Sequence, residues 1–226
     1  MVNAGLLLLA DSRLPAGGHA HSGGLEPAAT AEVVRDLAGL ADFLRGRLAT
    51  TGLVTAALAA AACAQALAGG TGWAALDAEA DARTPSPAQR QASRAQGRSL
   101  LRAAGTAWPH PAFGALRAAL PAGPHHPVVL GVATAAAGGS PRDAAGIAAL
   151  GSVTGPASAA VRLLGLDPLA VHRLLASLSG LVDSVADEAT VHAGEQGWAL
   201  LPAASAPLLD LFAERHLVSE LRLFES

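Results

Sequence analysis

The 226-residue chain contains no lysine, and all 15 of its basic residues are arginines. A P-loop places a lysine on the nucleotide phosphates, and Schiff-base catalysis requires an amine side chain. Both chemistries are therefore excluded for this chain.

Cysteine and aromatic residues are also scarce. Cys63 is the only cysteine, so the chain cannot form an internal disulfide, which is typical of a reducing compartment. The apolar run at residues 6–9 is too short for a secretory signal and no basic residue precedes it, so we expect a cytoplasmic protein. Tyrosine is absent, aromatic residues make up 3% of the chain and the net charge is −3, which argues against nucleic-acid binding.

Charge is absent from a long stretch as well, residues 48–76. A membrane-spanning helix needs about 20 predominantly apolar residues, so the stretch is long enough to be considered. Its apolar residues are mostly alanine, however, and it is interrupted by Gly52, Gln65, Gly69, Gly70 and Gly72. We therefore expect a helix buried at the centre of the protein and no membrane association.

Apolar residues recur at helical spacing along most of the chain. Residues 32–50 predict an amphipathic helix and residues 51–70 a helix that is apolar all round. Two further helical segments are predicted over residues 84–105 and 167–193. Their predicted N-caps are Ser86 and Asp167, each followed by a proline. Further helices are expected within residues 113–120, 127–139, 140–166 and 206–226. Gly155 and Pro156 should kink or divide the helix over residues 140–166. The prediction is an all-α, single-domain bundle over residues 1–226 with about eight to ten helices.

Seven arginines and no acidic residue lie between Asp81 and Asp143. Four of them, at positions 90, 94, 98 and 102, fall on one face of a predicted helix. Like charges at this spacing repel by roughly 0.2–0.5 kcal/mol per pair, so an acidic partner is expected opposite the stripe. Two partners stay open: acidic residues of this chain, with Asp183, Asp187 and Glu188 as candidates, or the acidic surface of another protein.

Two histidines, His19 and His21, lie in a glycine-rich loop, GGHAHSGG at residues 17–24. In an extended loop both side chains point the same way and could reach one metal ion, with Glu26 as a third ligand. Because a structural zinc needs four ligands and a catalytic zinc at least three, we predict no metal site and no enzyme. A small metal-binding enzyme that uses His19 and His21 is the alternative. Elsewhere in the chain, the consecutive residues His125 and His126 are flanked by prolines and are expected to face solvent.

The same loop belongs to a longer stretch, LLLLADSRLPAGGHAHSGGLE at residues 6–26, which resembles the N-terminal signature of the urease accessory protein UreF family. The matching positions are Asp11, Ser12, Leu14, Pro15, Gly17, His21, Ser22, Gly24, Leu25 and Glu26, whereas His19 stands where most members carry an aromatic residue. Further matches, most similar to the actinobacterial branch, are Ser93, Gln96, Gly97, Arg98, Arg162, Leu163, His216, Arg222, Leu223, Phe224 and Ser226.

This resemblance implies an all-α accessory protein that helps to insert nickel into apo-urease and has no cofactor of its own. Members of the family form homodimers, bind the accessory protein UreD (also called UreH) and recruit the GTPase UreG. Whether the protein acts like a GTPase activator or as a gate for nickel release stays open.

Two segments are expected to meet these partners. Residues 1–26 form a flexible glycine-rich segment that orders on a partner, and residues 214–226 form a docking tail with apolar side chains and an arginine donor. Packing of the tail on its own bundle is the alternative. The predicted partner-binding residues are Leu14, Pro15, Gly17, His21, Ser22, Gly24, Glu26, Arg94, Arg98, Arg162, His216, Arg222, Leu223 and Phe224.

Overall fold

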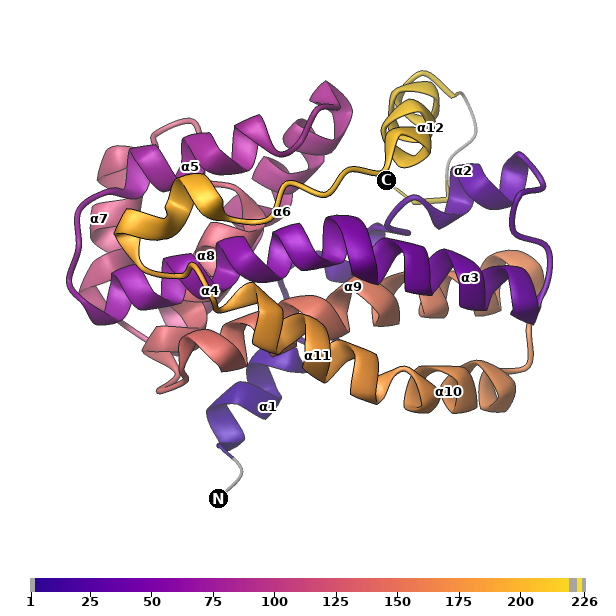
Figure 1. Ribbon diagram of the computed structural model, residues 1–226, viewed down its shortest axis with the longest axis horizontal. Helices are drawn as coiled ribbons and strands as arrows, with labels where there is room; N and C mark the ends of the chain where they lie inside the picture. The colour runs from indigo at the N-terminus through magenta and orange to yellow at the C-terminus, as the bar shows by residue number, and fades with distance from the viewer. Residues whose placement is uncertain (1–2, 220–222, 225–226) are drawn as a thin grey trace.

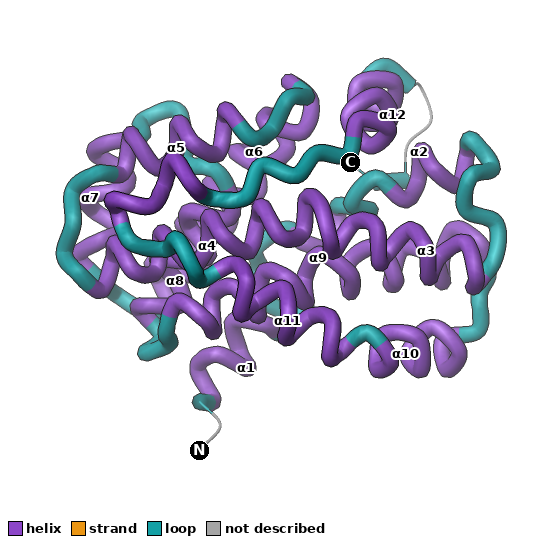
Figure 2. Tube along the Cα trace, viewed as in Figure 1, coloured by secondary structure: helices purple, strands orange, loops and turns teal. Residues whose placement is uncertain are grey.

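The computed structural model describes residues 3–219 and 223–224, and every regular element within them is helical (Figures 1 and 2). The α-helices are α1 (Ala4–Ala10), α2 (Leu25–Thr30), α3 (Leu37–Arg47), α4 (Leu53–Leu67), α5 (Trp73–Ala82), α6 (Pro87–Ala107), α7 (Pro111–Ala119), α8 (His126–Ala136), α9 (Pro141–Leu164), α10 (Pro168–Ser177), α11 (Ser179–Ala189) and α12 (Pro207–Leu217). Short 3₁₀ segments span Gly18–Ala20 and Glu195–Leu200.

The all-α prediction is confirmed, but the helices outnumber the eight to ten that were expected. A π-helical turn, Leu48–Gly52, joins α3 and α4 into one continuous helix over Leu37–Leu67. The predicted helix over residues 167–193 is divided into α10 and α11, which meet at a bend of 45°. Ser86 and Asp167 cap α6 and α10 as predicted, because each side chain accepts backbone N–H groups of the first turn.

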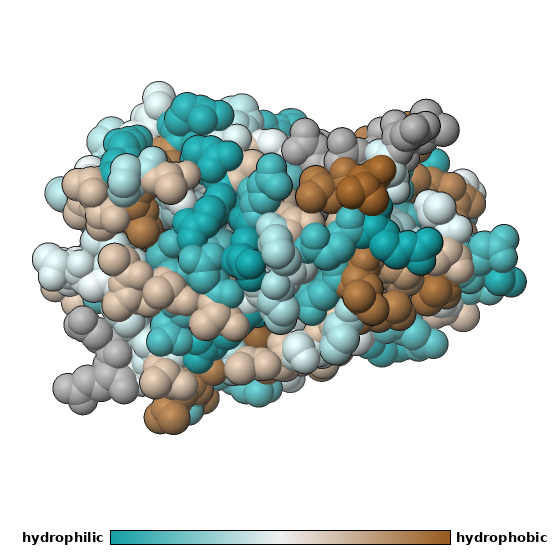
Figure 3. Space-filling view, turned by 90° about the horizontal axis from the view of Figure 1, so that it is seen from above, coloured by the Kyte–Doolittle hydropathy of each residue, from teal (hydrophilic) through white to brown (hydrophobic). Residues whose placement is uncertain are grey.

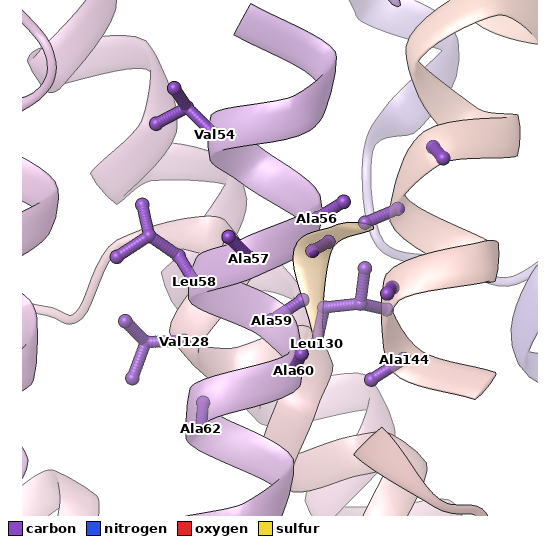
Figure 4. Close-up of a cluster of buried hydrophobic side chains, with 14 of the residues drawn as sticks. Val54, Ala56, Ala57, Leu58, Ala59, Ala60, Ala62, Val128, Leu130 and Ala144 are labelled. Atoms are coloured by element: carbon purple, nitrogen blue, oxygen red, sulfur yellow. The ribbon is translucent and has the colours of Figure 1, made fainter. Parts of the chain in front are cut away.

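The core is organised around α4, whose residues are buried on nearly all sides (Figure 4). Helices α8 and α9 pack against it most extensively, and α6 packs against α8. The contact surfaces are built from small side chains such as Ala57, Ala60 and Ala144, interleaved with Val128 and Leu130. The predicted buried central helix is thereby confirmed, since alanine allows helix axes to approach closely.

A very close approach of two helices in this core occurs at Gly131 of α8. A Cβ atom at this position would lie 2.2 Å from the Ala59 carbonyl oxygen and 2.6 Å from the Ala62 Cβ, both on α4. Neither of these atoms can move without shifting the helix that carries it.

We expect Gly131→Ala to lower the free energy of unfolding by about 1–3 kcal/mol, because overpacking forces α4 and α8 apart. The measurement is urea unfolding followed by circular dichroism. Gly151→Ala is the matched control, since Gly151 lies inside α9 and a methyl group added there would meet no atom within 4 Å. Equal stability of the two variants would contradict this account of the α4–α8 contact.

Pro156 lies inside α9 without dividing it, contrary to one of the two outcomes expected from the sequence. Proline cannot donate the backbone hydrogen bond to the residue four positions earlier, so the Ser152 carbonyl is left without that donor. The Arg47 guanidinium supplies a replacement, because its Nε donates to the Ser152 oxygen at 3.0 Å. A side chain from α3 thus stabilises the interior of α9.

Among the described residues, two helices are long and apolar enough to cross a membrane when judged by length and composition alone, namely Leu37–Leu67 and Pro141–Leu164. The bent pair α10–α11 would make a third. Within their most apolar windows, 72% and 56% of the residues are buried inside the protein. Packing within the chain therefore accounts for much of their apolar character.

Candidate functional site at the chain ends

The two ends of the chain meet at Glu26, in the first turn of α2. Its buried carboxylate accepts the backbone N–H groups of Leu223 at 2.8 Å and of Phe224 at 2.9 Å. The Nε2 of His216, in α12, lies 3.1 Å from the Phe224 carbonyl oxygen and 3.5 Å from the Glu26 carboxylate. Because a carbonyl oxygen only accepts, Nε2 donates the hydrogen bond to Phe224. We call Glu26, His216 and the residues they hold, Leu223 and Phe224, the tail clamp.

The aromatic ring of Phe224 faces into the protein and is 5% exposed. The Arg162 guanidinium lies over this ring, 4.5 Å from its centroid, at a distance typical of a cation–π contact. The adjacent Leu223 points outward and is 78% exposed. Phe224 therefore packs on the bundle of its own chain, which was the alternative to docking. Leu223 is exposed and can contact a partner. Arg222 lies outside the described residues.

Helix α12, which carries His216 of the tail clamp, and its C-cap residue Val218 expose further apolar side chains. Leu208, Leu211 and Val218 are 52%, 63% and 79% exposed. Figure 3, which looks down on this side of the molecule, shows apolar surface gathered toward the end that carries α12. Exposed apolar side chains that gather on one side of a protein are typical of interaction sites.

The segment over residues 11–24, which we call the signature loop, leads from α1 to the clamp, and α2 starts directly after it at Leu25. Ser22 is fully buried, and its Oγ accepts the backbone N–H of Glu26 at 3.2 Å, which positions the clamp carboxylate. Gly17 and Gly24 adopt left-handed backbone angles that L-residues rarely tolerate. Leu14 packs on the core, Pro15 is exposed and His21 is partly buried. The predicted flexibility of residues 1–26 stays a prediction, although residues 4–10 form α1.

The arginine stripe has a different partner from the one expected. Arg94 donates to Asp77 at 2.9 Å and to Asp81 at 2.7 Å, both on α5, and also to the Gly123 carbonyl at 2.6 Å. The candidates Asp183 and Asp187 instead pair with Arg142. Because Arg94 is engaged inside the chain, it is not available as a docking side chain in this arrangement.

Arg98 remains as the exposed member of the predicted docking pair. Its guanidinium donates to the Ala122 carbonyl at 3.2 Å, and no ion pair is formed by it within the described part of the chain. Docking through Arg98 therefore stays a prediction.

The expectation that His125 and His126 face solvent is wrong. His125 is 1% exposed, with Nδ1 3.0 Å from the Ser93 hydroxyl and Nε2 2.9 Å from Asp81. Burial lowers the pKa of the partly buried His126 to about 4, with a smaller contribution from His21 nearby. The loop that carries His125 can pack closely against α6 because Gly97 has no side chain. A Cβ atom at Gly97 would lie 2.1 Å from the Pro124 carbonyl oxygen.

One group of possible metal ligands exists among the described residues, namely Asp77, Asp81 and His125. Sequence reasoning missed it, because His125 lies 44 and 48 residues from the two aspartates, which are one turn apart on α5. Arg94 already forms ion pairs with both carboxylates, and Arg90 lies 3.9 Å from Asp81, so the geometry fits an ion-pair network better than a cation site. His21 is not part of this group, and the side chain of His19 is not described, so the described residues do not test the alternative of a His19–His21 metal site.

Together, these features define an all-helical protein whose chain ends are joined on one face beside exposed apolar side chains. The family model named UreF matches residues 34–179. A urease accessory protein UreF from Mycolicibacterium vanbaalenii is 48% identical over 223 residues, 99% of this chain and 98% of that protein. Relatives of the same name from Mycobacterium sp. (strain JLS) and Mycobacterium tuberculosis are 46% and 45% identical, covering 98% and 93% of this chain and 97% and 92% of their own lengths. The chain therefore belongs to the UreF family of urease accessory proteins.

Proposed function

We propose that this protein is a non-catalytic adaptor that bridges UreD (UreH) and the GTPase UreG during nickel insertion into apo-urease. It acts in the cytoplasm as a homodimer, off the membrane and without nucleic acid, and it modulates GTP hydrolysis by UreG. The similarity to urease accessory proteins over nearly the full chain supports a maturation role. The absence of lysine supports a division of labour in which the nucleotide is bound by another chain.

The geometric observation that carries the docking proposal is the exposed apolar surface beside the tail clamp. Leu211 on α12 and Leu223 on the tail are both more than half exposed, and the clamp fixes the backbone from which Leu223 projects. A preordered apolar anchor loses little conformational entropy on binding. This surface is the one we assign to UreD.

Co-expression with UreD and UreG, followed by size-exclusion chromatography, tests the proposal. Leu211→Glu combined with Leu223→Glu should abolish co-elution with UreD, because the charges would be buried at the interface. Both positions are exposed in the free chain, so the double variant should fold normally by circular dichroism. Leu169→Glu is the matched control, since Leu169 is 79% exposed on α10 and should not affect the complex.

Removing the last ten residues is a second test, but it also removes Phe224 from the core. Loss of the complex in both the truncated chain and the folded double variant supports the adaptor and its docking surface. Failure of the unmodified, folded chain to co-elute with either protein would contradict the proposed function. A complex that the double variant preserves would contradict this assignment of the surface.

A further inference from the structure

Arg47 lines a cleft of about 710 Å³ that runs between the signature loop, the π-helical turn and α9. Its Nε donates to the Ser152 carbonyl, which has no backbone donor because residue 156 is a proline. Gly23 of the signature loop covers the guanidinium, since a Cβ at Gly23 would lie 3.2 Å from the Arg47 Cζ. The arginine is therefore held in place from two sides.

The remaining N–H groups of this guanidinium have no acidic partner among the described residues. Two carboxylates line the cleft: Asp11, which is bound by Arg13, and Asp210. Burial lowers the pKa of Arg47 to about 10, and no neighbouring acid opposes the shift. A partly buried cation without a counter-charge is unfavourable, and an anion in the cleft would relieve it.

A second polar group with no partner lines the same cleft. The Thr51 hydroxyl is buried and makes no hydrogen bond among the described residues. It lies one turn beyond Arg47, within the π-helical turn Leu48–Gly52, and such turns occur frequently at functional sites. Leaving a buried hydroxyl unpaired costs about 1–3 kcal/mol, which a ligand that accepts its hydrogen bond would recover.

We propose that this cleft binds an oxyanion, a carboxylate or a phosphate, through the free N–H groups of Arg47 and the hydroxyl of Thr51. The planar guanidinium matches the paired oxygens of such anions, and the hydroxyl adds a third donor. His21, His126 and His172 also line the cleft, so its wall adds further hydrogen-bonding groups and little negative charge. The cleft borders the tail clamp, since Arg162 and His216 also line it, but neither of the proposed anion donors is among the side chains assigned to the UreD surface.

Isothermal titration calorimetry and thermal unfolding with sodium phosphate and sodium acetate test the site, with sodium chloride at equal ionic strength as the reference. Phosphate or acetate should raise the melting temperature above the chloride value and bind with one site per chain. Fluorescence anisotropy with a labelled hexaglutamate peptide tests whether the carboxylate can come from a protein.

Three variants locate the response. Arg47→Met should weaken anion binding at least about tenfold, the effect of losing a charge-assisted contact worth about 1.4 kcal/mol or more. Arg45→Met is the control, because Arg45 is exposed and pairs with Asp42 at 3.4 Å on the same helix. Thr51→Val keeps the shape of the side chain but removes the hydroxyl. It should weaken anion binding, while the stability of the anion-free protein should be unchanged or higher.

Binding of phosphate or acetate that Arg47→Met and Thr51→Val reduce, and Arg45→Met does not, supports a site for a dissolved anion. Binding of the peptide alone, with the same dependence on the variants, supports a protein carboxylate as the ligand. Absence of both responses in the unmodified chain overturns the proposal. If Arg47→Met fails to fold, unaltered anion binding by Thr51→Val overturns the pairing of the two residues.

Discussion

Arg94→Glu lowers the free energy of unfolding by about 3–5 kcal/mol, because it removes one partner from a buried ion pair and leaves the other uncompensated. The side chain of Asp77 is 3% exposed and depends on Arg94 for its counter-charge. The new glutamate would also face Asp81 at the position where the guanidinium now lies. Urea denaturation of the purified variant measures the loss.

Arg98→Glu is the control, since its side chain is exposed and donates only to the Ala122 carbonyl among the described groups. We expect a change within about 0.5 kcal/mol. If the two substitutions destabilised the protein equally, the ion-pair network would not have the importance assigned to it here. A loss of complex formation in Arg94→Glu therefore reports on folding, and only Arg98→Glu tests the stripe as a docking surface.

Glu26→Ala releases the tail and lowers the free energy of unfolding by about 2–4 kcal/mol, because a buried and a partly buried backbone N–H group lose a charged acceptor. The ring of Phe224 then leaves its place beneath Arg162. Amide hydrogen exchange at Phe224 should accelerate at least about tenfold relative to the unmodified chain.

Glu32→Ala provides the matched comparison, since Glu32 follows the end of α2, is exposed and pairs only with Arg35 in the described structure. Its effect on stability should stay below about 1 kcal/mol, and exchange at Phe224 should not change. Unaltered exchange in Glu26→Ala would show that the tail is held by other contacts. The proposed role of the clamp would then be wrong.

Local sequence signals predicted most of the longer helices, although α1 and α5 were not expected. The N-caps at Ser86 and Asp167 and the all-apolar helix around Cys63 depend on residues within one or two turns, and all three are present. The errors arose where a distant segment decided the outcome. His125 was expected in solvent because prolines flank it, yet a glycine on α6 allows its loop to pack inward.

The candidate site divides in the same way. The resemblance to UreF drew attention to Glu26, His216 and Phe224 as separate positions, without indicating that they touch. Glu26 and Phe224 are 198 residues apart, and only the packing of α2 against α12 brings the carboxylate under the tail. Arg47 and Thr51 were not singled out, because nothing in the local sequence marks a guanidinium without a counter-charge.

The sequence by itself determined the all-helical fold, the buried alanine-rich helix and the exclusion of lysine chemistry, because helical periodicity, N-caps and composition are properties of neighbouring residues. Tertiary structure alone decided which charges are paired, which histidines are buried and which tail residue is exposed. Pairing and burial depend on distances between atoms far apart in the chain, and those distances exist only once α4, α8 and α9 have packed together.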